Sequence, residues 1–128
     1  MKPNLQFSVP CLDVDCAGNV LNFKRVFFDL PSYDFPTPPF EYFYVANSWI
    51  GGEGSFEAKV RILDPEGNIL KGSTFSHKFY LEDRHVPFMT LLKFENIIFP
   101  QAGYYTVEIF LDEELKLSYP LELRKIKL

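Results

Sequence analysis

The chain has 128 residues, a length that suits one domain, and its formal net charge is −4. Without a basic excess it has no electrostatic attraction to nucleic acid or to an anionic membrane surface, so neither is expected as a partner. Hydrophobic residues make up 47% and aromatic residues 17%, with fourteen Phe and seven Tyr. This composition excludes wholesale disorder and favours β-strands.

The N-terminal segment and the cysteines bear on location. Met1-Lys2-Pro3 is followed by strand-like alternation, so no secretory leader is expected, and no apolar run approaches the ~18 residues of a membrane helix. Cys11 and Cys16 lie five positions apart in one extended stretch, which places them on opposite faces and too far apart for a disulfide. Free thiols suit a reducing compartment, and we expect a cytoplasmic protein.

The first predicted strand begins at Leu5 and alternates apolar and polar residues up to Cys11. After Pro10 the apolar positions shift by one residue, to Leu12, Val14 and Cys16. A proline at such a shift predicts a bulge, in an edge strand or in a strand that crosses between sheets. Gly18-Asn19 predicts a turn, and a second strand is expected from Val20 to Leu30.

The remaining elements follow in regular order. Residues 31–39 contain four prolines and are expected to form a loop, because each proline removes a backbone donor. Turn signals then recur through the chain, and no segment has helical periodicity. The further predicted strands run from Phe40 to Ile50, Phe56 to Ile62, Ile69 to Glu82, Phe88 to Phe99, Gly103 to Leu111 and Leu115 to Leu123. This pattern predicts a single all-β domain over residues 1–128, with two facing sheets.

One segment suggests a specific architecture. From Leu92 to Val107 the chain reads L-K-F-E-N-I-I-F-P-Q-A-G-Y-Y-T-V. This resembles the E-to-F segment of immunoglobulin-like sandwiches, in which a leucine strand leads to Ala-Gly-x-Tyr. The resemblance implies an immunoglobulin-like antiparallel β-sandwich of seven or eight strands. It also implies a structural corner, in which Gly103 opens a strand and Tyr105 bonds back to upstream backbone.

Further motifs point to a narrower relationship. These are the Pro-rich stretch, the D-P-x-G turn that begins at Asp64, and the last strand pair that begins at Gly103. With them, the chain resembles a family of uncharacterised small bacterial proteins with an immunoglobulin-like β-sandwich. That resemblance implies no activity, and many unrelated activities share such a fold.

The sequence holds no recognisable catalytic set. There is no G-x-S-x-G motif, and Ser76 and His77 are adjacent on a strand, which points them to opposite faces. His85 is expected to be an exposed loop histidine beside Asp83 and Arg84. We therefore expect that the protein is not an enzyme.

Metal and cofactor motifs are also lacking. The two His and two Cys do not have the short spacing that forms a tetrahedral site. Asp13 and Asp15 share a strand face, and Asp29 or Asp34 would complete an oxygen-rich calcium site. The competing interpretation is an ordinary acidic surface, which we favour. No metal and no cofactor are expected.

The strand from Phe40 to Ile50 carries large rings on both faces. A sandwich strand normally buries one face and exposes the other to water, so the second face needs a cover. The Pro-rich loop, a second copy of the protein and a ligand are the three covers we consider. The residues on one face are Phe40, Tyr42 and Tyr44, and those on the other are Phe43, Val45 and Trp49.

These observations favour a non-enzymatic interaction or structural module. It would bind itself, as a homo-oligomer, or a protein partner, through the aromatic strand face or a free sheet edge. The alternative is a carbohydrate-binding module that stacks sugars on Tyr42, Tyr44 or Trp49, because Tyr and Trp are used by both kinds of surface.

Overall fold

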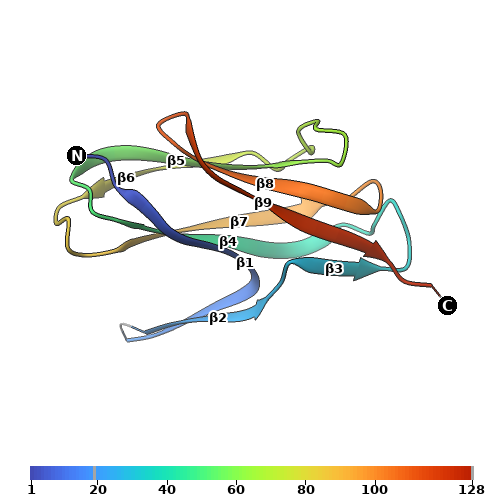
Figure 1. The fold of residues 1–128 in the computed structure, drawn as a ribbon. Coiled ribbons are helices and arrows are strands. Elements are labelled where there is room, and N and C mark those ends of the chain that lie inside the picture. Colours follow the sequence, from blue (N-terminus) through green and yellow to red (C-terminus); the bar gives the residue numbers. More distant parts are fainter. Residues whose placement is uncertain (19, 128) are drawn as a thin grey trace.

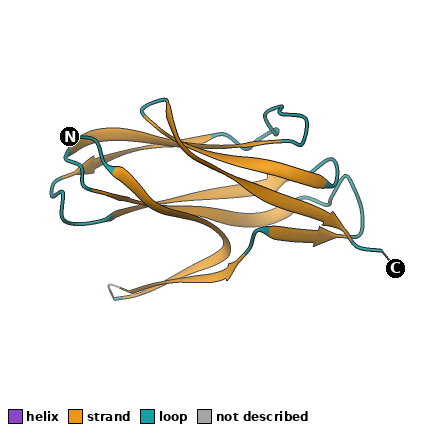
Figure 2. Ribbon diagram, viewed as in Figure 1, coloured by secondary structure: helices purple, strands orange, loops and turns teal. Residues whose placement is uncertain are grey.

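The computed structural model describes residues 1–18 and 20–127, and this part of the chain forms nine strands and no helix (Figures 1 and 2). Asn19, in the predicted Gly18-Asn19 turn, lies outside the described residues. Nothing in the described part has the length and apolar character of a membrane-crossing helix. The strands are β1 (Asn4–Ala17), β2 (Val20–Val26), β3 (Asp29–Ser32), β4 (Phe40–Ile50), β5 (Gly54–Leu63), β6 (Phe75–Leu81), β7 (Phe88–Ile97), β8 (Gly103–Leu111) and β9 (Glu114–Lys125).

The strands form two sheets that pack on a common core. One sheet has the order β2-β1-β4-β7 and the other the order β3-β9-β8-β5-β6. Neighbouring strands are antiparallel, except that β3 runs parallel to β9. In the ribbon, β1 curls strongly, so that its C-terminal half and β2 extend away from the rest of the first sheet (Figure 1).

Alternation along the strands supplies the core. In β5, Phe56, Ala58, Val60 and Ile62 are buried, while the residues between them are partly exposed. Such period-two burial is what places one face of a strand against the opposite sheet. Aromatic rings fill much of the interior, and Phe43 stacks on Phe94 with ring centroids 5.1 Å apart.

The predicted strand from Val20 to Leu30 is wrong in one respect, because it breaks at Phe27 and Phe28. Phe27 is buried and packs edge-on against Phe43 at 5.8 Å. The carbonyl of Phe28 accepts a hydrogen bond from the amide of Glu122 at 2.9 Å. The chain therefore leaves the first sheet here and joins the second as β3, which gives nine strands among the described residues in place of seven or eight.

The predicted strand from Ile69 to Glu82 is also shorter than expected, because β6 begins at Phe75. The preceding residues form a wide turn that is fixed by Ser73. Its buried hydroxyl lies 2.6 Å from the carbonyl oxygen of Leu70 and 3.1 Å from that of Ile62. These local bonds replace the ladder that a continuous strand would have made.

The corner between β7 and β8 lies at Gln101 to Tyr105. The buried phenol of Tyr105 donates to the carbonyl of Gln101 at 2.7 Å and accepts from the Gln101 amide at 3.2 Å. Gly103 has φ 139°, and a Cβ there would lie 3.0 Å from Cγ of Pro65. The corner thus packs directly against the turn that begins at Asp64, and a side chain at position 103 would push the two apart.

Candidate functional site

The structure separates the three aromatic residues proposed as a binding set. Tyr42 and Tyr44 lie half-buried on the outer face of β4, with ring centroids 5.8 Å apart and ring planes at 77°. The ammonium group of Lys93 lies 4.7 Å from the centroid of the Tyr42 ring. Trp49 is 0% exposed on the inner side, and its indole N–H donates to the hydroxyl of Thr90 at 3.2 Å. These residues therefore form no common surface.

Phe40 also departs from the predicted arrangement. It packs against the core, with its ring 5.4 Å from that of Phe99. Its register partner is Ile97, which follows the positive-φ residue Asn96. The β4–β7 register is the same at Phe40 and Tyr42, so no bulge separates them. The Phe40 ring contacts Phe99, whereas the rings of Tyr42 and Tyr44 contact each other.

The chain's own β1–β2 hairpin encloses part of the second face of β4. Phe23 on β2 meets Phe7 on β1 edge-on at 6.0 Å, so the curled hairpin reaches back to the first half of β1 (Figure 1). A hollow of about 360 Å³ between the hairpin and β4 is lined by Leu12, Asp13, Lys24, Arg25, Glu41 and Tyr42. The hairpin is thus a fourth cover, which differs from the Pro-rich loop, the second copy and the ligand considered from the sequence.

The Pro-rich segment has a different role from covering Tyr42 and Tyr44. The amide of Thr37 donates to the carbonyl of Phe99 at 3.0 Å, and the Thr37 hydroxyl accepts from the Phe99 amide at 3.0 Å. Thr37 is buried. This reciprocal pair ties the segment to the connection that follows β7.

The acidic residues weighed as calcium ligands are dispersed. Asp15 pairs with Lys24, Asp29 pairs with Arg124 at 3.2 Å, and the Asp13 carboxylate accepts from a neighbouring amide. In the described part of the chain, no three His, Cys, Asp or Glu side chains are grouped so as to hold a metal ion.

The histidines and cysteines are equally scattered. His85 lies 3.0 Å from Asp83, and both are exposed. The backbone amide of His85 bonds the Asp83 carboxylate and is the main cause of its lowered pKa. Cys11 is buried, which raises the pKa of its thiol, while Cys16 is exposed, and both thiols are free.

The four edge strands differ in how they are protected. An edge strand offers unpaired N–H and C=O groups to an incoming strand unless a proline, a bulge or its shortness prevents pairing. β2 contains Arg25 at φ 56°. β7 contains Asn96 at φ 56° near its end, while its residues 88–95 have neither proline nor positive φ. β3 has four residues and includes Pro31. β6 has seven residues, and none of them is proline or has positive φ.

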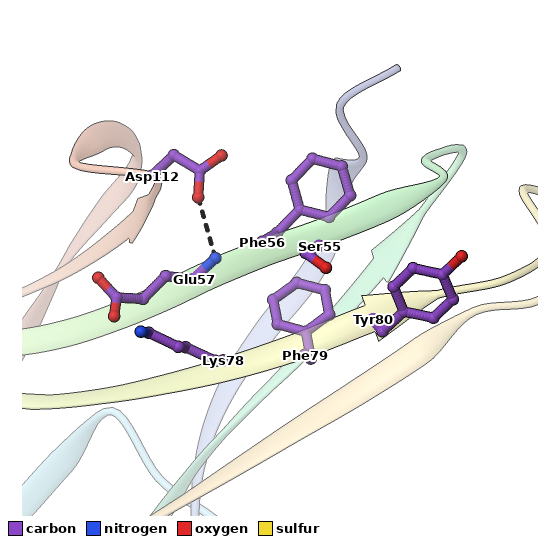
Figure 3. Close-up of a pocket in the computed structure, with 7 residues that line it drawn as sticks. All are labelled: Ser55, Phe56, Glu57, Lys78, Phe79, Tyr80 and Asp112. Carbon is purple, nitrogen blue, oxygen red and sulfur yellow. Dashed lines mark hydrogen bonds between the residues drawn. The ribbon is translucent and has the colours of Figure 1, made fainter.

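A broad hollow lies beside this edge. It has a volume of about 660 Å³ and is lined by Ser55, Phe56, Glu57, Lys78, Phe79, Tyr80 and Asp112 (Figure 3). In the β5–β6 register, Lys78 lies opposite Glu57 and Tyr80 lies opposite Ser55. Tyr80 is 61% exposed. The edge therefore presents a large ring and a cation next to an open depression.

The turn between β8 and β9 helps to shape the hollow. The carboxylate of Asp112 accepts from the Glu57 amide at 2.9 Å (Figure 3). The Asp112 amide in turn donates to the Glu57 carbonyl at 2.8 Å. These two bonds fix the end of β8 against β5. The depression is thus built on paired backbone rather than on a free loop.

The rest of the outer face of β5 and β8 is occupied by charge pairs. Arg61 pairs with Glu108 at 2.6 Å, and Lys59 pairs with Glu113 at 2.8 Å. Both cations also lie over the Phe110 ring, 4.8 and 4.9 Å from its centroid. These side chains already pair with one another, so this part of the face carries no free charge for a partner.

The edge was not identified from the sequence, because strand order depends on distant pairing. Residues 75–81 alternate like the other strands, and nothing local marks them as terminal in a sheet. A signal was nevertheless present, since Lys78 stands at the middle of the strand. A lysine at such a position is typical of an edge strand.

These features define a class of protein: an all-β domain of two sheets with a free strand edge. The chain matches the model of a family of unknown function, DUF6941, over residues 6–124, and it belongs to that family. No curated protein matches the chain.

Proposed function

We propose that this chain is an immunoglobulin-like β-sandwich that serves as a non-enzymatic interaction module. It binds an extended protein segment, its own or a partner's, along the free edge of β6. The observation that carries the proposal is the seven-residue edge strand that lacks proline and positive φ and borders a hollow of about 660 Å³.

Strand addition fits the chemistry of this edge. An added strand gains main-chain hydrogen bonds from the edge, and side chains at alternate positions enter neighbouring pockets. Here the outward positions of β6 are Ser76, Lys78 and Tyr80, since their register partners on β5 are partly exposed while those of Phe75 and Phe79 are buried. An incoming side chain on that side would lie beside the hollow.

The immunoglobulin-like assignment is supported by the corner at Tyr105, whose phenol bonds to backbone four residues upstream. This contact is typical of such sandwiches. The curl of β1 and the parallel β3–β9 pair are departures from the simplest form of that fold. The bacterial origin and the cytoplasmic location expected from the sequence stay predictions.

A carbohydrate platform is less well supported by the geometry. Sugar rings stack best on aromatic faces that are exposed and parallel, whereas the planes of Tyr42 and Tyr44 differ by 77°. Trp49 is buried, and the neighbouring polar residue Asn47 is buried as well, so neither can reach a sugar.

The test is site-specific photo-crosslinking in the native host. A photoreactive phenylalanine analogue replaces Tyr80 in one variant and Tyr104 in the other; Tyr104 is 65% exposed and lies on β8, away from the edge. The proposal expects a discrete protein adduct from position 80 and none from position 104. Absence of an adduct at 80, or equal adducts at both positions, would refute it.

A further inference from the structure

We propose that the segment bound at the β6 edge is β6 of a second copy of this chain, antiparallel to the first, with Phe79 opposite the partner's Phe79. The proposal rests on the function proposed above and names the partner. It would join the two five-stranded sheets into one continuous sheet across a two-fold axis.

The symmetry restricts the register. When the two-fold axis is perpendicular to the sheet, each outward residue must lie opposite an outward residue of the second copy. One residue of β6 therefore lies opposite its own copy in the partner, and the axis runs between these two copies. Within β6 the central choices are His77, Lys78 and Phe79. Moving the axis from one of these residues to the next changes the register by two positions, so every side chain stays on its own face of the sheet.

Charge decides among these registers. An axis at Lys78 places two ammonium groups directly opposite each other, which is unfavourable. An axis at His77 places Lys78 opposite the partner's Ser76 and leaves Tyr80 beyond the paired strands. An axis at Phe79 places Lys78 opposite the partner's Tyr80, and the same contact occurs a second time by symmetry. A cation over a tyrosine ring is attractive, so this register is selected.

The neighbouring strand completes the arrangement. Lys78 lies opposite Glu57 on its other side, so a row across the interface reads Glu57, Lys78 and the partner's Tyr80. The Glu57 carboxylate offsets the positive charge of Lys78, which would otherwise repel the lysine of an incoming β6 strand. The exposed Tyr80 ring, 61% accessible in one copy, becomes covered in the pair.

The experiment is sedimentation velocity on the full chain over a concentration series. We expect a reversible dimer for the wild type. Tyr80→Lys places lysine opposite lysine twice and weakens the dimer by about tenfold or more. Tyr104→Lys is the matched control, with the same chemical change on an exposed β8 residue, and it leaves the dimer unchanged. Tyr80→Glu keeps or strengthens the dimer, because it places a glutamate opposite the partner's Lys78 twice and leaves the Lys78–Glu57 pair unchanged.

Each other outcome overturns the inference. A wild type that stays monomeric, a Tyr80→Lys variant that dimerises as the wild type does, or a Tyr80→Glu variant that stays monomeric while its circular dichroism is native would contradict the pairing. A monomeric wild type that still gives a crosslink from position 80 to another protein would refute the second copy alone. Loss of both the crosslink and the dimer would refute strand addition itself.

Discussion

Tyr105→Phe tests the corner that holds β7, β8 and the Asp64 turn together. The substitution keeps the ring, which packs edge-on against Phe99 at 5.1 Å, and removes only the hydroxyl. Two hydrogen bonds to Gln101 are lost, one donated at 2.7 Å and one accepted at 3.2 Å. At a net ~1 kcal/mol each, with a further cost for leaving backbone groups unpaired, unfolding becomes easier by about 1–3 kcal/mol.

Urea denaturation measures this change directly. Trp49 is the sole tryptophan and is 0% exposed, so its fluorescence reports global unfolding. For a chain of this size, a loss of about 2 kcal/mol lowers the melting temperature by about 7 °C. Tyr104→Phe removes a hydroxyl from the adjacent, exposed residue and is expected to change stability by less than about 0.5 kcal/mol.

The reasoning about the corner fails if the two variants lose the same stability. Equal midpoints for Tyr105→Phe and Tyr104→Phe would mean that the buried phenol contributes nothing beyond its ring. A changed denaturant slope in Tyr105→Phe would instead indicate a different compactness of the folded or unfolded state. We expect a shifted midpoint and an unchanged slope.

Three other substitutions have expected outcomes. Asn47→Val should raise the free energy of unfolding by about 1–3 kcal/mol, because both amide atoms of Asn47 are buried without a hydrogen-bond partner; a less stable variant in urea would contradict this. Glu113→Gly should raise it by about 1 kcal/mol, since residue 113 has φ 67°, and an unchanged or lower melting temperature would count against that reasoning. Burial raises the pKa of Tyr119 to about 12, so the folded state keeps a proton that the unfolded chain loses near its ordinary value of 10.0. Stability should therefore fall as pH rises through this interval, by at most about 2.7 kcal/mol, and Tyr119→Phe should flatten that part of the pH–stability curve; identical slopes would refute the assignment.

The alternation of apolar and polar residues predicted correctly the strands that have turn residues at both ends. β4 and β8 have the predicted bounds, because Phe40 to Ile50 and Gly103 to Leu111 are each bounded by turn residues. Such strands need only nearby residues to be read. The predicted bulge after Pro10 is wrong, because the pairing of β1 is continuous through Pro10 and Cys11 and its register shift lies between Leu5 and Phe7. At Cys11 the pairing partner of β1 instead changes from β4 to β2.

The missed features depend on residues far apart in the sequence. The break at Phe28 coincides with its bond to Glu122, nearly a hundred positions away, and neither glycine nor proline occurs between Val20 and Leu30 to mark it. The cover over Tyr42 likewise comes from the β1–β2 hairpin. It depends on the direction in which β1 curls, which could not be predicted from the sequence. The candidate site at β6 was missed for the same reason, because edge position is a property of the whole sheet.

Amide hydrogen exchange on the complex purified from the native host tests the binding edge most directly. The account predicts that exchange in residues 75–81 slows on binding, while exchange in the other long edge, residues 88–97, stays as in the free chain. Protection gained along residues 88–97, with none along residues 75–81, would contradict it.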